Sequence, residues 1–167
     1  DSTPMVCIIG QVKDSLLGTD AFQEADVINI TSPITKWNYQ ITNADEIPEI
    51  LAKAFYIATS GRPGTVVIDV TKNAQQDKMN NAFSYKKCKQ LSSYHPRLVP
   101  KPHQVSAAAE LINAAKKPYL FVGHGVLISK AEAELKAFAE KTGIPVASTL
   151  RGLSAFPVAH PLYVGML

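Results

Sequence analysis

Short, uninterrupted apolar runs constrain the fold of this chain more than any other feature. Such runs occupy residues 5–9, 65–70 and 119–122, and a weaker one occupies residues 145–148. A strand that is apolar on both faces is typical of a parallel sheet covered by helices. Residues 34–41 alternate apolar and polar side chains instead, which predicts a strand with one polar face.

Helical periodicity separates these runs. Residues 45–60 place their apolar side chains on one face, with Asp45 as the expected N-cap and Gly61 just beyond the end. A second helix is expected over residues 102–117, with Pro102 in its first turn. Ser129 and Glu132 have the spacing of a capping box, which predicts a third helix ending at Gly143. The alternation predicts an α/β fold with largely parallel sheets and flanking helices.

The apolar periodicity stops between residues 72 and 101. This segment contains Asn80-Asn81 and a group of lysines, and it predicts a linker between one lobe at residues 1–71 and another at residues 102–167. The second lobe has too few elements to enclose a core of its own. The chain also enters a strand within a few residues of Asp1 and lacks a polar tail, so we expect two partial lobes of a longer polypeptide.

Composition excludes several classes of protein. The chain has 167 residues, of which 46% are apolar and 19% charged, as in globular proteins with a buried core. No apolar run approaches the roughly 20 residues that span a bilayer, so no membrane contact is expected. Two cysteines without a paired motif favour a reducing, cytoplasmic compartment. The lysines at 86, 87 and 89 lack an aromatic stacking platform, so no nucleic-acid partner is expected.

Three turns carry the candidate chemistry. The run Gly123-His124-Gly125 follows a strand and precedes a helix, where a glycine-rich turn lets backbone approach a phosphate, although a tight turn alone also explains it. Arg62 is not required by its turn and suits a phosphate or carboxylate partner, or lies in solvent. Residues 18–24 combine an aromatic and an amide side chain that can line a pocket. No nucleophile, catalytic triad or metal-ligand spacing is present, so these patterns alone predict no reaction.

Five segments together resemble a known family, the large catalytic subunit of acetohydroxyacid synthase (acetolactate synthase). They are PMVCIIGQV at 4–12, GTDAFQEAD at 18–26, ITKWNY at 34–39, AFYIATSGRPG at 54–64 and KTGIPVASTL at 141–150. The resemblance implies a thiamine-diphosphate-dependent transferase that joins two 2-ketoacids, with loss of carbon dioxide, to form acetolactate for branched-chain amino-acid synthesis. It also implies thiamine diphosphate, Mg²⁺ and FAD as cofactors, a homodimer with shared active sites, and a small regulatory subunit.

The resemblance further assigns the two lobes and their site residues. Residues 1–71 would be the C-terminal half of the thiamine-enzyme pyrimidine-binding domain, and residues 102–167 the first part of a Rossmann-like central flavin-binding domain. Phe22 and Gln23 would face the active site and Lys72 the substrate entrance. Flavin binding would involve Arg62, Gly123, Gly125, Thr149, Leu150, Arg151, Gly165 and Met166. Lys13 and Ala21 would belong to the surface that herbicides contact, while Lys13, His124 and Arg151 depart from the family pattern.

Two catalytic parts of the family lie outside this sequence. The glutamate that activates the thiamine ring would precede Asp1, and the chain has no Gly-Asp dipeptide that could begin the family's GDG…N magnesium motif. We therefore expect no metal ligands here and no activity from the isolated chain. The alternatives are a sibling thiamine enzyme, such as glyoxylate carboligase or pyruvate oxidase, and a stand-alone nucleotide- or flavin-binding α/β module.

Overall fold

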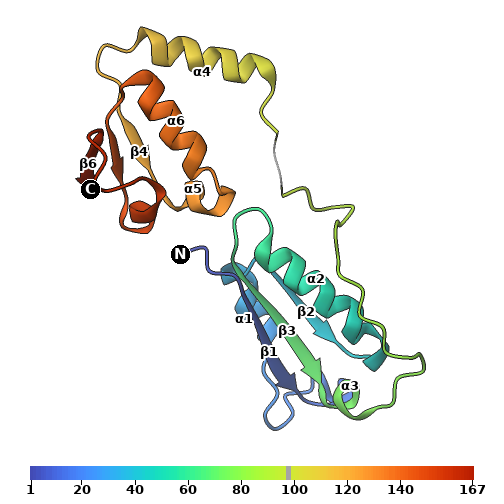
Figure 1. Cartoon of the computed structure of the whole chain (residues 1–167). Coiled ribbons are helices and arrows are strands. Elements are labelled where there is room, and N and C mark those ends of the chain that lie inside the picture. The colour runs from blue at the N-terminus through green and yellow to red at the C-terminus, as the bar shows by residue number, and fades with distance from the viewer. Residues whose placement is uncertain (97–98) are drawn as a thin grey trace. The chain divides into compact units, whose positions relative to one another are not determined.

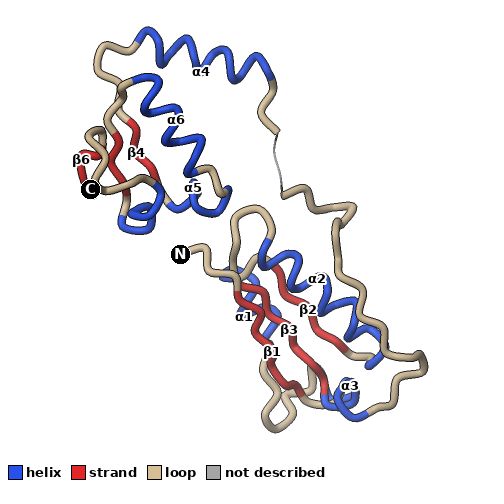
Figure 2. The backbone as a smooth tube through the Cα atoms, in the orientation of Figure 1, coloured by secondary structure: helices blue, strands red, loops and turns tan. Residues whose placement is uncertain are grey.

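The computed structural model describes residues 1–96 and 99–167, and the chain divides into two units, Asp1–Val99 and Pro100–Leu167. Each unit contains one sheet of three parallel strands accompanied by helices (Figures 1 and 2). The prediction of an α/β fold with parallel sheets is confirmed. The segment predicted as a linker, residues 72–101, lies mostly in the first unit, and the predicted domain boundaries remain a prediction.

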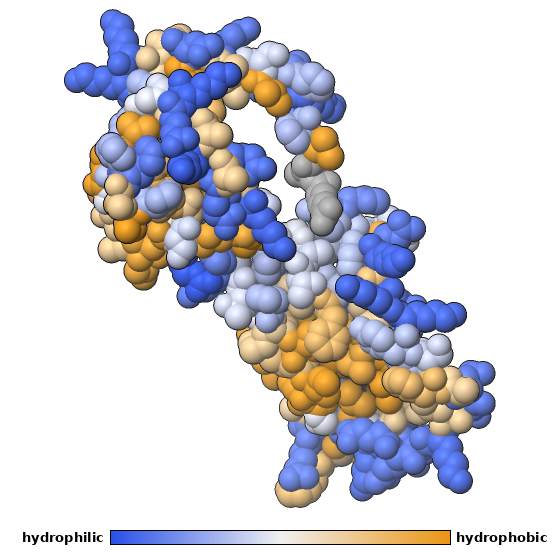
Figure 3. Space-filling view, viewed as in Figure 1, coloured by the Kyte–Doolittle hydropathy of each residue, from blue (hydrophilic) through white to orange (hydrophobic). Residues whose placement is uncertain are grey.

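The sheet of the first unit has the order β1-β3-β2, formed by β1 (Met5–Gln11), β3 (Thr65–Thr71) and β2 (Trp37–Ile41). The central strand is buried on both faces from Val66 to Thr71, as its apolar run predicts. The same expectation is wrong for β1, where the Ile8 side chain is 62% exposed, because β1 is an edge strand with a single paired neighbour. Figure 3 shows apolar side chains gathered on one face of this unit.

Helix α2 (Ile47–Thr59) covers one face of this sheet. Ile50, Ala54 and Ile57 pack in one buried cluster with side chains of β2 and β3. The predicted N-cap at Asp45 is wrong, because a 3-10 turn, η3 (Ala44–Glu46), precedes the helix and Asn43 accepts the hydrogen bond from the Asp45 amide. The smaller elements of the unit are η1 (Asp14–Leu16), α1 (Val27–Thr31), η2 (Ser32–Ile34) and α3 (Lys72–Gln76).

Residues 80–96, which we call the strap, attach to both ends of α2 (Figure 1). At the first end, Asp45 accepts hydrogen bonds from the Asn80 amide and side chain and from the Asn81 amide. At the other end, the Tyr94 hydroxyl lies 3.0 Å from Lys36 Nζ and 3.2 Å from the Ser60 carbonyl. Burial alone would raise the pKa of Tyr94, but hydrogen bonds from Lys36 Nζ and the Ser60 hydroxyl, together with the Lys36 charge, outweigh it and lower the pKa.

The second unit begins with α4 (Pro102–Ala114), in which no residue is buried. Its sheet has the order β4-β5-β6, formed by β4 (Leu120–Val122), β5 (Val146–Ser148) and β6 (Tyr163–Met166). Between these strands lie α5 (His124–Ser129), α6 (Glu132–Thr142) and the 3-10 helix η4 (Leu150–Ala155). The core cluster contains Val122, Ala139, Val146, Ala155 and Phe156.

The predicted capping box is wrong. Ser129 ends α5, where its hydroxyl donates to the Gly125 carbonyl at 2.8 Å, and Ala131 is the N-cap of α6. Lys130 adopts a left-handed conformation with φ of 56°, which turns the chain between the two helices. A serine hydroxyl bonds equally well to a preceding helical carbonyl, so the local pattern did not decide its partner.

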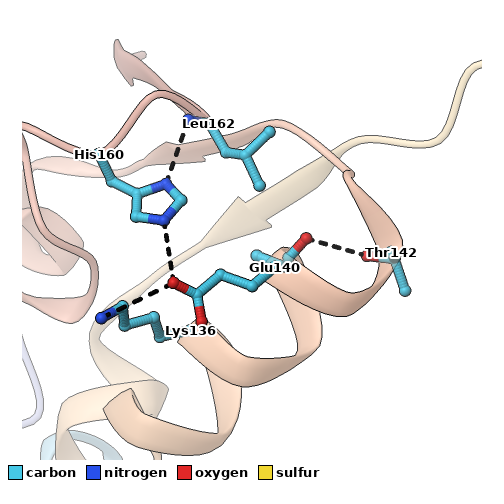
Figure 4. Close-up of polar contacts among 6 residues, drawn as sticks. Lys136, Glu140, Thr142, His160 and Leu162 are labelled. Carbon is cyan, nitrogen blue, oxygen red and sulfur yellow. Dashed lines mark hydrogen bonds and ion pairs between the residues drawn. The ribbon is translucent and has the colours of Figure 1, made fainter.

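His160 joins the loop before β6 to α6 (Figure 4). Its Nδ1 accepts a hydrogen bond from the Leu162 amide at 3.2 Å, and its Nε2 lies 3.3 Å from Glu140 Oε1. Lys136 Nζ lies 3.7 Å from the same oxygen. Because Nδ1 accepts, the proton of a neutral ring resides on Nε2 and points at Glu140. These contacts connect the residues just before β6 to α6.

Candidate functional site

A cavity of about 660 Å³ opens in the first unit, at the ends of β1 and β3. The carboxyl ends of neighbouring parallel strands are the usual ligand site of an open α/β sheet. All three residues predicted as catalytic, Phe22, Gln23 and Lys72, line this one cavity. The other lining residues are Gly10, Gln11, Val12, Lys13, Leu16, Asn73, Gln76 and Asp77.

Lys72 reaches the cavity because β3 ends at Thr71 and α3 begins at Lys72. The Lys72 amide donates to the Val12 carbonyl at 3.3 Å, which ties this turn to the end of β1. Asn73 strengthens the junction, since its Oδ1 accepts from the Asp14 amide at 3.0 Å and its Nδ2 donates to the Thr42 carbonyl at 2.8 Å. The backbone that carries the Lys72 side chain is therefore held by two neighbouring segments.

Phe22 and Gln23 lie on a loop that the Glu24 carboxylate holds together. Its two oxygens accept hydrogen bonds from the amides of Gly18 and Ala21, the latter at 3.0 Å. The Gly18 amide is the largest of several backbone donors that lower the pKa of Glu24. Gln23 adopts φ of 66°, which is uncommon for a residue with a side chain. The Phe22 side chain is 89% exposed beside the cavity.

A buried polar network lies next to the cavity. Asp69 on β3 is fully buried, and its Oδ2 accepts from Gln40 Nε2 at 2.7 Å and from Gln11 Nε2 at 3.2 Å. Gln11 Nε2 also donates to the Ala25 carbonyl at 2.7 Å, directly after the loop of residues 18–24. Asp69 Oδ1 is buried without a hydrogen-bond partner among the described residues. Orphaned buried oxygens are uncommon in folded proteins.

Most residues predicted to bind flavin gather in the second unit, at the carboxyl ends of its strands. Gly123 follows β4, Thr149 follows β5, and Gly165 and Met166 end β6. The Thr149 amide donates to the Val122 carbonyl at 2.9 Å, and His124 Nδ1 lies 3.2 Å from the Arg151 carbonyl. Leu150 is 69% exposed at the same edge.

The glycines at this edge differ in their packing. A Cβ on Gly125 would meet nothing within 4 Å, and one on Gly123 would come no nearer than 3.6 Å to Thr149 Oγ1. These two glycines leave the backbone accessible to a ligand. A Cβ on Gly152 would lie 2.6 Å from the Val122 carbonyl oxygen. The close approach of β4 and η4 thus requires Gly152, which the sequence patterns did not single out.

Arg62, also predicted to bind flavin, lies in the first unit, away from the cavity. It occupies the turn before β3, at the opposite end of that strand from Lys72. Its side chain is exposed, and Nε donates to Ser2 Oγ at 2.8 Å. The predicted flavin residues are therefore distributed over both units, and their common role remains a prediction.

Within residues 1–96 and 99–167, no three His, Cys, Asp or Glu side chains are grouped so that they could hold a metal ion. No helix in these ranges is long and apolar enough to cross a membrane.

Several known proteins are similar to this chain in sequence or structure. Residues 105–167 match the family of the thiamine pyrophosphate enzyme central domain. The acetolactate synthase large subunit of Corynebacterium glutamicum is 49% identical over 166 residues, which cover 99% of this chain and 26% of the relative. The Haemophilus influenzae acetolactate synthase large subunit is 41% identical over 167 residues, covering all of this chain and 29% of the relative.

Solved structures are also similar to this chain. Benzoylformate decarboxylase from Polynucleobacter necessarius has a TM-score of 0.82 at 26% identity, covering 99% of this chain and 30% of that structure. The chain thus spans between a quarter and a third of these relatives. Over its whole length it is similar to the acetolactate synthase large subunits, and its residues 105–167 match the central-domain family of the thiamine pyrophosphate enzymes.

Proposed function

We propose that this chain is the part of an acetolactate synthase that admits the 2-ketoacid and contributes to flavin binding. The observation that carries the proposal is the cavity of the first unit, where residues from two separate segments, Phe22 and Gln23 from one and Lys72 from the other, come together. Their positions in the sequence are up to 50 residues apart, and the carboxyl edge of a parallel sheet is where such sites form.

The chemistry of the cavity suits a small ketoacid. The Lys72 ammonium offers a compact positive charge for the carboxylate, and Gln23 offers an amide that can donate to a keto oxygen. The Phe22 ring supplies apolar area against which the carbon chain can pack. Together they would orient the substrate before its reacting atoms meet the cofactor.

Thiamine diphosphate, when bound to such an enzyme, would supply a nucleophilic carbon for the keto group and an electron sink for the decarboxylation. This chain would contribute the substrate side of that site. For FAD we propose the carboxyl edge of the second sheet, with the open backbone at Gly123 and Gly125 facing the flavin. Flavin contact by Arg62 remains a prediction. The homodimer, the regulatory subunit and the cytoplasmic location remain predictions.

The test is a Lys72→Ala substitution in a full-length acetolactate synthase that carries this segment. We expect the KM for pyruvate to rise about tenfold, because a charge-assisted hydrogen bond to the carboxylate is lost. The flavin content should not change. Lys78→Ala is the matched control, since Lys78 is an exposed lysine just after α3 that does not line the cavity. Identical kinetics for the two variants would overturn the role of Lys72.

A further inference from the structure

Two clamps hold the loop of residues 18–24, and each uses a polar side chain that lies outside the predicted catalytic set. The inner clamp is Glu24, whose carboxylate bridges the amides of Gly18 and Ala21 across the loop. The outer clamp is Gln11, whose Nε2 donates to the Ala25 carbonyl at 2.7 Å just after the loop. The same carbonyl accepts from the Val27 amide at 2.8 Å, where α1 begins.

The outer clamp is anchored in the centre of the sheet. Gln11 is 8% exposed at the end of β1, and its Oε1 accepts from the Val12 amide at 2.9 Å. Its Nε2 lies 3.2 Å from Asp69 Oδ2 on the neighbouring strand, a contact between residues 58 positions apart. With both amide groups engaged, the Gln11 side chain has one orientation, and that orientation presents a donor to Ala25.

Burying the Asp69 side chain at this position costs free energy of folding. It is fully buried, one of its oxygens lacks a partner in the described part of the chain, and its other oxygen is held by two glutamines. A well-packed apolar residue often stabilises such a site at least as well as a buried charge. An acceptor oxygen at this position is therefore better explained by the orientation it imposes on Gln11 than by stability.

The loop needs this support because of its backbone. Asp20 and Gln23 adopt φ of 57° and 66°, and such conformations persist only where the surrounding structure determines them. Phe22 is 89% exposed and cannot hold the loop by its own packing. We propose that Gln11, Asp69 and Glu24 are positioning residues that hold Phe22 and Gln23 at the cavity. The catalytic part of this inference rests on the proposed function, whereas the clamp itself does not.

The first experiment measures amide hydrogen exchange in the 167-residue chain. Gln11→Leu should speed exchange at residues 18–25 about five- to tenfold, the effect of losing one buried hydrogen bond. Gln40→Leu is the matched control, because Gln40 donates to the same Asp69 oxygen at 2.7 Å but does not contact the loop. Equal exchange in the two variants would show that Gln11 does not clamp the loop.

Two further variants cover the case in which Gln11→Leu does not fold. Glu24→Gln changes only the inner clamp and should speed exchange at the Gly18 and Ala21 amides by a similar factor. Asp69→Asn should behave like the parent chain. Its Oδ1 can accept from both glutamines while its Nδ2 takes the place of the orphaned oxygen. Fast loop exchange in Asp69→Asn, or unchanged exchange in Glu24→Gln, would contradict the proposal.

The second experiment measures kinetics in the full-length enzyme that carries this segment. Gln11→Leu should lower kcat/KM for pyruvate about tenfold without loss of flavin, and Asp69→Asn should retain most of the activity. If Lys72→Ala impairs pyruvate use but Gln11→Leu does not, the positioning role is wrong and the proposed function stands. If neither Lys72→Ala nor Gln11→Leu changes pyruvate use, but Gln11→Leu still speeds exchange in the loop, then Gln11 does hold the loop and the proposed function is wrong.

Discussion

Helices α2 and α4 have the same length, 13 residues, and both place apolar side chains at helical spacing, more strongly in α2 than in α4, and they differ in burial. Six residues of α2 are buried, whereas none of α4 is. Leu111 on α4 is 75% exposed, while Ile50 on α2 is 5% exposed. An amphipathic pattern thus predicts a helix, but it does not predict that the apolar stripe is covered.

The sheets of the two units also differ in burial, and the first unit is again the more deeply buried. In the first, β3 is seven residues long and lies between two parallel neighbours, and its side chains are buried on both faces. In the second, the strands have three or four residues, and the cluster contains fewer buried side chains. Because hydrophobic stabilisation scales with the apolar area removed from water, the first unit should be the more stable.

The largest expected effect is in the core of the first unit. Ile68→Ala removes a fully buried side chain and should lower the free energy of unfolding of this unit by about 2–5 kcal/mol. Trp37, the only tryptophan, packs against the same core, so its fluorescence in a denaturant titration reports this unit alone. Leu111→Ala on α4 is the control and, followed by far-UV circular dichroism, should change stability by less than about 0.5 kcal/mol. A comparable loss from both variants would end the contrast between the covered core of the first unit and the exposed stripe of α4.

A smaller effect is expected in the second unit. Gly152→Ala would place a Cβ 2.6 Å from the Val122 carbonyl oxygen, and overpacking of this kind costs about 1–3 kcal/mol. Hydrogen exchange at β4 and β5 should become faster, with no change in the Trp37 signal. Gly125→Ala is the matched control, since its Cβ meets nothing within 4 Å and alanine favours a helix. Unchanged exchange in Gly152→Ala would show that η4 can move away at no cost.

The smallest effect concerns the strap. The side chain of Asn80 is the main cause that lowers the pKa of Asp45, with the Asn81 amide second. A lowered folded-state pKa means that this attachment stabilises the fold above the ordinary value of 3.8 and is lost as the pH falls through the lower, folded value. The Asn80 side-chain resonance should therefore shift with a titration midpoint below 3.8.

Removing the carboxylate tests the same attachment at neutral pH. In Asp45→Ala, trypsin should cleave faster after Lys86, Lys87 and Lys89, which lie on the exposed part of the strap between its two attached ends. Glu110→Ala on α4 is the control and should leave the cleavage rate unchanged. Cleavage that begins elsewhere in the first unit would mean that the strap is held by contacts other than Asp45.

The long periodic segments were predictable, and the short polar contacts were not. The helix expected at residues 45–60 and the strand at 65–70 appear as α2 and β3, because each has enough apolar residues for its period to be unambiguous. The six-residue α5 and four-residue β6 were missed, since such lengths carry little periodicity. The caps expected at Asp45 and Ser129 were wrong, because each side chain has a competing partner that the local pattern does not reveal.

The candidate site likewise contains some residues that were identified from the sequence and others that were not. Phe22, Gln23 and Lys72 were identified by resemblance to a family, and the structure places them around one cavity, although their roles remain predictions. Gln11, Glu24 and Asp69 were not identified as supports for that cavity. Gln11 and Asp69, 58 positions apart, carry no sequence signal for a shared network, because their contact follows from strand pairing and not from a motif. Glu24 makes its contacts within its own loop, to the amides of Gly18 and Ala21.

The sequence by itself determined which segments form helices and strands, and hence the α/β class with parallel sheets, because hydrophobic periodicity is a local property of the chain. Only the tertiary structure decided which apolar faces are covered, which polar group caps which helix, and which side chains meet at the cavity. These outcomes depend on competition among partners that lie far apart in sequence, such as Gln11 with Asp69 or Asp45 with Asn80. Folding brings donors and acceptors from distant parts of the chain into hydrogen-bonding geometry. The partner of a polar side chain therefore cannot be predicted from the residues next to it in sequence.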